Sequence, residues 1–299
     1  FPYCLHFSPG SRVSCAIEMY EEGDMDRAIK CITLLIDASF VVAISCVLLA
    51  KWKLTGFLKY GKTLLSVDDK KHDGDRKEKR EKTSVLQILD FFESIVVPRA
   101  WFSHFYIIST FFSLVNGIWY PGHLIAWLPL FHSLRRLYES YCISKFGAES
   151  KMNISHYLVG IWFYTSLNLI FSIGLSKDNK ITSLSSNSAF QLIALFLFLA
   201  SSYNQYQNHV YLSKLVKYTN PKKGLFKWVS CAHYFDEILI YFSLFGYARV
   251  SRYEYLADGL KYCLLWVGIN LSVSAIETRT YYSHRYQDVA PHAIIPFVL

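Results

Sequence analysis

The sequence predicts an all-α integral membrane protein with about seven transmembrane helices. Of the 299 residues, 53% are hydrophobic and 17% are aromatic. The apolar residues fill blocks of about 20 residues, the length of a helix that crosses a bilayer. We place these blocks at 28–50, 101–119, 123–140, 156–175, 188–204, 235–250 and 256–275. A large soluble helical protein is the alternative, but the blocks are too many and too long for it.

The distribution of basic residues predicts the orientation of these helices. The formal net charge is +8, which by itself would also suit a nucleic-acid-binding protein. Lysines and arginines cluster after the first, third and fifth blocks, and the other connections are shorter or less basic. Because cytosolic loops of membrane proteins are rich in basic residues, this alternation places the N-terminus in the lumen or outside and the C-terminus in the cytosol. We therefore expect a membrane-embedded protein with no nucleic-acid partner.

Three segments outside the apolar blocks, at the N-terminus, in the middle of the chain and at the C-terminus, carry separate predictions. We expect residues 1–18 to be a non-native or dispensable extension, so that a chain starting at Met19 is fully active, and 19–299 to form one domain. The run "DDKKHDGDRKEKREK" is too charged to fold alone and predicts a cytosolic loop at 66–83. The tyrosine-rich segment 276–299 has too many aromatic residues for a disordered tail, and we expect it to pack onto the cytosolic end of the bundle.

Cysteine and histidine spacing gives no sign of a disulfide framework or a metal centre. The seven cysteines contain no Cys-x-x-Cys pair, and the ten histidines are scattered. We therefore predict neither disulfides nor a metal site.

The stretch "PLFHSLRRLYESYC" (129–142) places charge at the end of the third block. Arg135 and Glu139 are four residues apart, as are His132 and Arg136, so each pair shares a helix face. We expect Glu139 to neutralise one guanidinium and to leave the other free for an anion such as phosphate, which suits the planar arginine side chain. The alternative is a pair of arginines that reach the membrane surface, with an ordinary ion pair.

Three further polar sets lie at the same ends of their blocks. They are His104 with Tyr106; Gln205, Asn208, His209 and Ser213; and His233, Asp236 and Glu237. Helix capping is the alternative role for Asp236, and an interfacial aromatic belt is the alternative for Tyr106. Together the four sets predict one cavity, open to the cytosol, that suits a polyanionic cofactor and an apolar substrate.

Several segments resemble the steroid 5α-reductase family, and specifically its polyprenol reductase branch in fungi. They are "VPRAWFSHFYIISTFFSLV", "HSLRRLYES", "MNISHYLVGIWFY", "NQYQNHVYLSKLVKY", "HYFDEILIY", "ETRTYYSHRYQD" and "APHAIIPFVL". They follow the family order from about residue 90 to the end, and the segment from Met19 also resembles the fungal N-terminus. The resemblance implies a seven-helix membrane fold in the endoplasmic reticulum and NADPH as cofactor. It also implies reduction of the α-isoprene double bond of a polyprenoid lipid on the way to dolichol, the carrier for protein N-glycosylation.

The resemblance also implies roles for individual residues. The expected cofactor-binding residues are Arg136, Gln205, Asn208, His209, His233, Glu237 and Tyr282. Ser133 stands where the steroid enzymes have a catalytic tyrosine, and this departure leaves the identity of the proton donor open. We expect it to be His104 or Tyr106, with Glu93 and Tyr282 next in line.

Hydride chemistry narrows the substrate. A hydride adds readily to a carbon–carbon double bond only when a conjugated group takes up the charge, which an α,β-unsaturated aldehyde does and an allylic alcohol does not. We therefore favour polyprenal over polyprenol. A 3-oxo-steroid or enoyl-thioester reductase of the same fold is the alternative, and a transporter or receptor is a further one, although we see neither broken helices nor inverted repeats.

Overall fold

The computed structural model describes residues 9–53, 95–145, 147, 150–178, 188–216 and 219–299, with side chains from residue 24 onward. The charged loop expected at 66–83 lies outside these residues. The described part is nearly all helical, and its α-helices are α1 (Pro9–Lys53), α4 (Phe102–Trp119), α5 (Leu124–Tyr138), α6 (Ile154–Lys177), α7 (Ser188–Lys214), α8 (Ala232–Val250) and α9 (Glu254–Ser283). Each predicted apolar block is thus confirmed as a helix.

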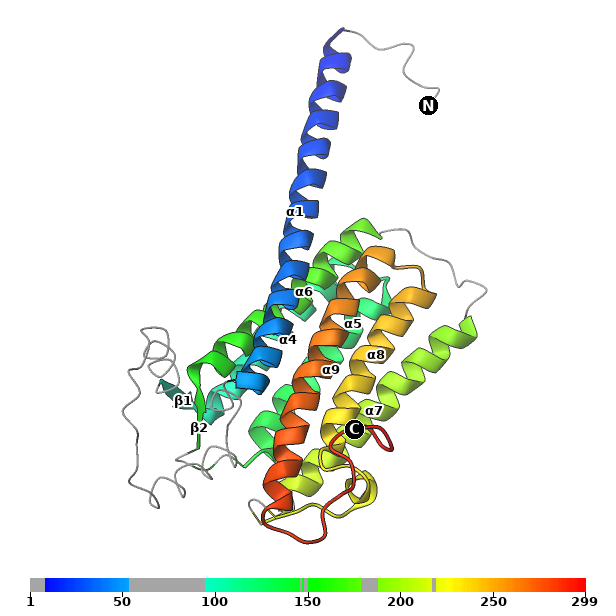
Figure 1. Cartoon of the computed structure of the whole chain (residues 1–299). Helices are drawn as coiled ribbons and strands as arrows, with labels where there is room; N and C mark the ends of the chain where they lie inside the picture. The colour runs from blue at the N-terminus through cyan, green and yellow to red at the C-terminus, as the bar shows by residue number, and fades with distance from the viewer. Residues whose placement is uncertain (1–8, 54–94, 146, 148–149, 179–187, 217–218) are drawn as a thin grey trace, which may run out of the picture.

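The helices pack side by side as one bundle (Figure 1). The packed pairs are α4 with α5 and α6, α7 with α8, α8 with α9, and α6 with α9, while α1 lies against α9 and α6. The N-terminal half of α1 extends beyond the other helices (Figure 1). This helix begins well before the predicted block, since the polar stretch ahead of residue 28 continues the same helix.

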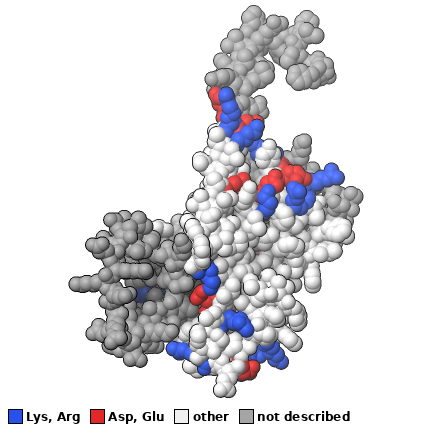
Figure 2. Space-filling view, viewed as in Figure 1, with Lys and Arg blue, Asp and Glu red and all other residues white. Residues whose placement is uncertain are grey.

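Three helices are long and apolar enough to span a membrane by length and composition alone: Asp24–Trp52, Ile154–Lys177 and Glu254–Ser283. The others are shorter or carry polar residues that face the bundle interior. On the face shown in Figure 2, charged side chains gather in two zones, and an uncharged belt separates them. The apolar helices and this uncharged belt are the features of a membrane protein.

Glycines allow α6 and α9 to approach closely. A Cβ atom on Gly174 would lie 2.7 Å from the Leu256 backbone, and one on Gly259 would lie 2.6 Å from Ile170. Lipid tails are as apolar as helix side chains, so no hydrophobic force drives membrane helices together. Small residues at such contacts let the helix backbones pack closely instead. The two glycines therefore let the last turns of α6 pack against the first turns of α9.

The all-α prediction missed two short strands. β1 (Val96–Pro98) pairs antiparallel with β2 (Lys151–Asn153). The 3-10 turn η2 (Arg99–Trp101) connects β1 to α4, and β2 directly precedes α6. Asn153 then caps α6, because its side chain accepts a hydrogen bond from the backbone N–H of Ser155 (2.8 Å). The pair aligns the starts of two neighbouring helices, and three-residue strands are too short to produce an alternating pattern.

The C-terminal segment packs onto the bundle, as predicted from its aromatic content. The N–H of Cys231 donates to the carbonyl of Ala293 (3.1 Å), and the N–H of His292 donates to the carbonyl of Trp228 (3.1 Å). Ile294 is completely buried against the start of α8 and the end of α9. The last residues thus cover the end of the bundle where α8 begins.

Candidate active site

Glu139 is the centre of a buried charged network at the end of α5. It lies in a π-helical turn, η3 (Glu139–Ile143), that continues α5, and π-helical turns occur frequently at functional sites. Its carboxylate accepts a hydrogen bond from Arg135 through Oε1 (2.5 Å) and one from Arg136 through Oε2. Glu139 is 0% exposed.

This geometry corrects the prediction that Glu139 leaves one guanidinium free. Glu139 is four residues from Arg135 and three from Arg136, so its two oxygens reach both side chains. The predicted pair between Arg135 and Glu139 is confirmed, but Arg136 shares the same carboxylate. Only the edges of the two guanidinium groups that Glu139 does not use remain for other partners.

Helix α7 supplies two further members of the network. Gln205 accepts a hydrogen bond from Arg135 Nη2 (2.6 Å). His209 Nδ1 lies 2.6 Å from Glu139 Oε2 and 2.8 Å from Arg136 Nη1. The imidazole nitrogen donates to the carboxylate when it is protonated and accepts from the guanidinium when it is not.

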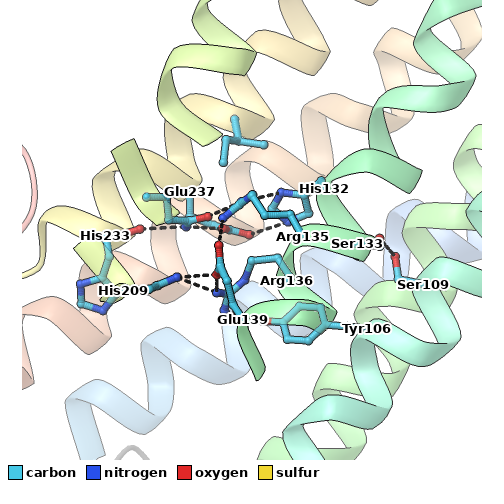
Figure 3. A network of polar contacts seen from close by, with 12 residues as sticks. Tyr106, Ser109, His132, Ser133, Arg135, Arg136, Glu139, His209, His233 and Glu237 are labelled. Atoms are coloured by element: carbon cyan, nitrogen blue, oxygen red, sulfur yellow. Dashed lines mark hydrogen bonds and ion pairs between the residues drawn. The ribbon is translucent and has the colours of Figure 1, made fainter. Parts of the chain in front are cut away.

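Helix α8 closes the network from the opposite side (Figure 3). Gln205 Nε2 donates to Glu237 Oε2 (2.5 Å) and to the backbone carbonyl of His233 (3.0 Å). His132 Nε2 lies 3.4 Å from Glu237 Oε1. The network thus contains two arginines and two glutamates with little exposure to solvent, where such charges are stable only when they are paired.

The side chains of the "SHFY" turn in α4 diverge. Tyr106 is 2% exposed, accepts a hydrogen bond from Arg136 Nη2 (2.7 Å), and lies under the guanidinium at 4.9 Å from the ring centre. His104 instead contacts the Tyr157 hydroxyl (3.2 Å) and packs on Trp101. Of the two expected proton donors, only Tyr106 is in the network, and Glu93 lies outside the described residues.

Two expected cofactor-binding residues, Asn208 and Tyr282, are not members of the network. Asn208 donates to Asp236 (2.7 Å), as does Asn204 (2.7 Å). Asp236 is the fifth residue of α8, so it joins α7 to α8 and does not act as the helix cap. Tyr282 is buried near the end of α9, where its ring packs against Tyr281 and Tyr286.

We call the set His132, Arg135, Arg136, Glu139, Gln205, His209, Glu237 and Tyr106 the charged network. The Nε atoms of Arg135 and Arg136 are buried and have no hydrogen-bond partner in the described part of the chain. A buried donor without a partner is costly, so these two N–H groups are available for an acceptor from a ligand. The arrangement suits the oxygen atoms of a phosphate.

A second buried polar set, the neutral ladder, consists of Ser109, Ser113, Asn116, Ser133, Asn168 and Ser172. Ser133 Oγ lies 2.6 Å from Ser109 Oγ, so the serine at the family's tyrosine position is held by α4. Asn168 then accepts from Ser113 (2.7 Å), and Asn116 accepts from Ser172 (2.6 Å). The ladder joins α4, α5 and α6 with hydrogen bonds and contains no charge.

Two tyrosines beside the charged network were missed by the sequence analysis. Tyr164 of α6 packs edge-on against Tyr106 at 5.4 Å between ring centres. Tyr241 of α8 packs edge-on against His132 at 6.1 Å. Both lie in apolar runs rich in aromatic residues, so the sequence does not separate them from lipid-facing tyrosines. The available signal was the four-residue spacing of Tyr241 from Glu237, which places both on one helix face.

Comparisons with known proteins identify the family of this chain. Residues 150–299 match the family model described as 3-oxo-5-alpha-steroid 4-dehydrogenase. The chain is 42% identical over 263 residues to the polyprenal reductase of Saccharomyces cerevisiae, covering 87% of this chain and 93% of the yeast protein. It is 26% identical to the polyprenal reductase of Drosophila melanogaster (68% of this chain, 77% of the relative) and 24% identical to that of Homo sapiens (68% and 78%). The chain therefore belongs to the 3-oxo-5-alpha-steroid 4-dehydrogenase family, the steroid 5α-reductases, in the branch that holds the polyprenal reductases.

Proposed function

We propose that the protein reduces the α-isoprene double bond of polyprenal with NADPH, on the route to dolichol and protein N-glycosylation. The observation that carries this proposal is the position of the charged network inside a bundle of apolar helices, in a chain that is 42% identical to a polyprenal reductase. Such a site places a charged cofactor next to a lipid substrate. It needs no metal ion.

The charged network is the proposed cofactor site. NADPH supplies a hydride when it is bound, and its phosphates need buried N–H donors. The unpaired Nε groups of Arg135 and Arg136 meet that need. We assign cofactor contacts to Arg136, Gln205, Asn208, His209, His233, Glu237 and Tyr282.

The charge distribution supports the proposed orientation in the endoplasmic reticulum membrane. Where α7 ends and α8 begins, the connecting segment carries Lys214, Lys222, Lys223 and Lys227. Basic residues mark the cytosolic side of a membrane protein. In this orientation the network and the C-terminal segment both lie toward the cytosolic side, where NADPH would be supplied.

An aldehyde suits a site in which hydrogen-bond donors lie beside an apolar interior. Hydride addition to the β-carbon moves charge onto the aldehyde oxygen, and donors placed around that oxygen stabilise the transition state. Of the two proton donors expected in α4, only Tyr106 is held in the network, by Arg136. The position of His104, beside Trp101 and Tyr157, favours an interfacial role.

Turnover by the purified protein in lipid nanodiscs tests the proposal. We expect NADPH-dependent conversion of a short polyprenal to the saturated aldehyde, identified by mass spectrometry, and little conversion of the matching polyprenol. Reduction of neither lipid, with NADPH binding intact by fluorescence titration, would refute the proposed substrate. A 3-oxo-steroid belongs in the same assay because the family description names that substrate class.

A further inference from the structure

Tyr241 carries a buried hydroxyl that the proposed cofactor site does not use. The side chain is 1% exposed, and its hydroxyl has no hydrogen-bond partner among the described residues. Tyr241 lies one helical turn beyond Glu237, on the same face of α8. Its ring packs between His132 (6.1 Å) and Phe163 (5.7 Å).

An unpaired hydroxyl in this position needs an explanation. Burying a hydroxyl without a partner is unfavourable, and phenylalanine would fill the same space without that penalty. Tyr106 accepts a hydrogen bond from Arg136 and Ser133 is paired with Ser109, whereas the Tyr241 hydroxyl has no partner of either kind among the described residues. The Tyr241 hydroxyl is therefore free to bind a ligand.

The surroundings of Tyr241 indicate which ligand atom it meets. Its ring packs against His132 of the charged network, and Glu237 of the network lies one turn earlier on the same helix, so Tyr241 lies at the edge of the charged network. On its other side is the apolar core around Phe163. A lipid whose polar head reaches the network and whose chain remains among apolar side chains would place its head group beside Tyr241.

Resting on the proposed function, we propose that Tyr241 is the catalytic residue that donates its proton to the aldehyde oxygen of polyprenal. A hydride adds to the β-carbon and forms a C–H bond. The electron pair of the α,β double bond moves to the bond between the α-carbon and the carbonyl carbon, and the carbonyl π pair moves to oxygen. The Tyr241 hydroxyl protonates that oxygen and gives an enol.

The enol then returns its proton. The α-carbon takes a proton from water, the carbonyl forms again, and the enol O–H proton goes back to the Tyr241 oxygen. The sum is one hydride and one solvent proton added across the double bond, with Tyr241 restored. In this role Tyr241 takes the place of the catalytic tyrosine that the steroid enzymes have where this chain has Ser133.

The substitution Tyr241→Phe removes one oxygen atom and tests the proposal. Loss of an oxyanion donor lowers kcat about 10²–10³-fold in other enzymes, and we expect a loss of that size for polyprenal at saturating NADPH. The Kd for NADPH should remain that of the parent. The apparent Tm in detergent should stay equal or rise, because the hydroxyl has no protein partner to lose.

A control on the same helix separates this role from a general effect. Tyr247 lies six residues further along α8, with its hydroxyl bonded to Ser251, and Tyr247→Phe should leave kcat unchanged. Parent-like turnover by Tyr241→Phe would overturn the assignment, as would a weaker NADPH affinity or a lower Tm that accounts for the loss. Absence of polyprenal turnover in the parent protein is a different result, since it refutes the proposed function itself.

Discussion

The charged network and the neutral ladder are both buried, yet they satisfy their polar groups differently. In the ladder, the Asn168 amide donates to Ser109 (3.3 Å) and to the Tyr164 carbonyl (2.9 Å) and accepts from Ser113. All of its members have partners inside the described bundle. The network instead leaves the Nε groups of both arginines without partners.

This difference separates a structural network from a functional one. A neutral network with complete pairing holds helices together, as hydrogen bonds between membrane helices do. A charged network with unused donors is costly in a low-dielectric interior and persists where a ligand completes it. The two regions share helices α4 and α5, so variants in each can be compared in one protein.

The largest expected effect comes from removing the centre of the charged network. Glu139→Ala leaves two buried arginines without their shared carboxylate. Breaking a buried ion pair by removing one partner typically costs about 3–5 kcal/mol of the free energy of unfolding, and we expect a loss of that order. Thermal unfolding in detergent and the monodisperse fraction in size-exclusion chromatography measure it.

An exposed ion pair provides the matched control. Arg249 and Glu254 form an ion pair whose side chains are 49% and 62% exposed. Since exposed pairs contribute about 0–1 kcal/mol, Glu254→Ala should change the Tm little. Equal effects of Glu139→Ala and Glu254→Ala would show that the buried carboxylate is not the centre of the network.

The next effect is on cofactor affinity. Arg136→Ala removes a charged donor, and such hydrogen bonds contribute about 1.5–3 kcal/mol, so the Kd for NADPH should rise by the corresponding factor of about 10–150. Folding should survive, because Glu139 retains Arg135 and His209 as partners. The exposed Arg249→Ala serves as control. Parent-like NADPH binding by Arg136→Ala would reduce Arg136 to a structural residue.

A ladder variant should show the opposite profile. Asn168→Ala removes three hydrogen bonds, and bonds of this kind in membrane helices average about 0.6 kcal/mol each, so we expect a loss of about 2 kcal/mol in stability. The Kd for NADPH should be unchanged when it is measured below the lowered Tm. Ser176→Ala, which removes an exposed local bond on the same helix, is the control. A large change in Kd would mean that the ladder belongs to the cofactor site.

The sequence predicts the helices well because a bilayer requires apolar runs of fixed length. It predicts less about backbone details: β1 and β2 are too short for alternation to appear, and the π-helical turn at Glu139 depends on hydrogen-bond register, which composition does not reveal. The packing of segment 276–299 onto the bundle was predicted from its tyrosines and is confirmed.

For the site, residue spacing predicts neighbours on one helix but not the sharing of a partner. The pairing of Arg135 with Glu139 follows from their spacing, whereas the second contact of Glu139, with Arg136, depends on side-chain geometry in three dimensions. For residues on different helices, the sequence predicted only that they line one cavity. It did not predict individual contacts such as that of Tyr106 with Arg136. The role we propose for Tyr241 rests on the absence of a partner, and a sequence cannot show that.

The smallest expected effect tests the boundary between the two regions. Ser133 follows His132 of the charged network in the chain, but its hydroxyl is bonded to Ser109 of the ladder. If Ser133 belongs to the ladder, Ser133→Ala should cost about 0.6 kcal/mol in stability and leave kcat and the Kd for NADPH unchanged. Ser109→Ala, which breaks the same bond from the other side, should match it in Tm and in turnover. A loss of kcat with Ser133→Ala alone would instead assign the acid function to this serine, at the position where the steroid enzymes have tyrosine, and would move the boundary between the two networks by one residue.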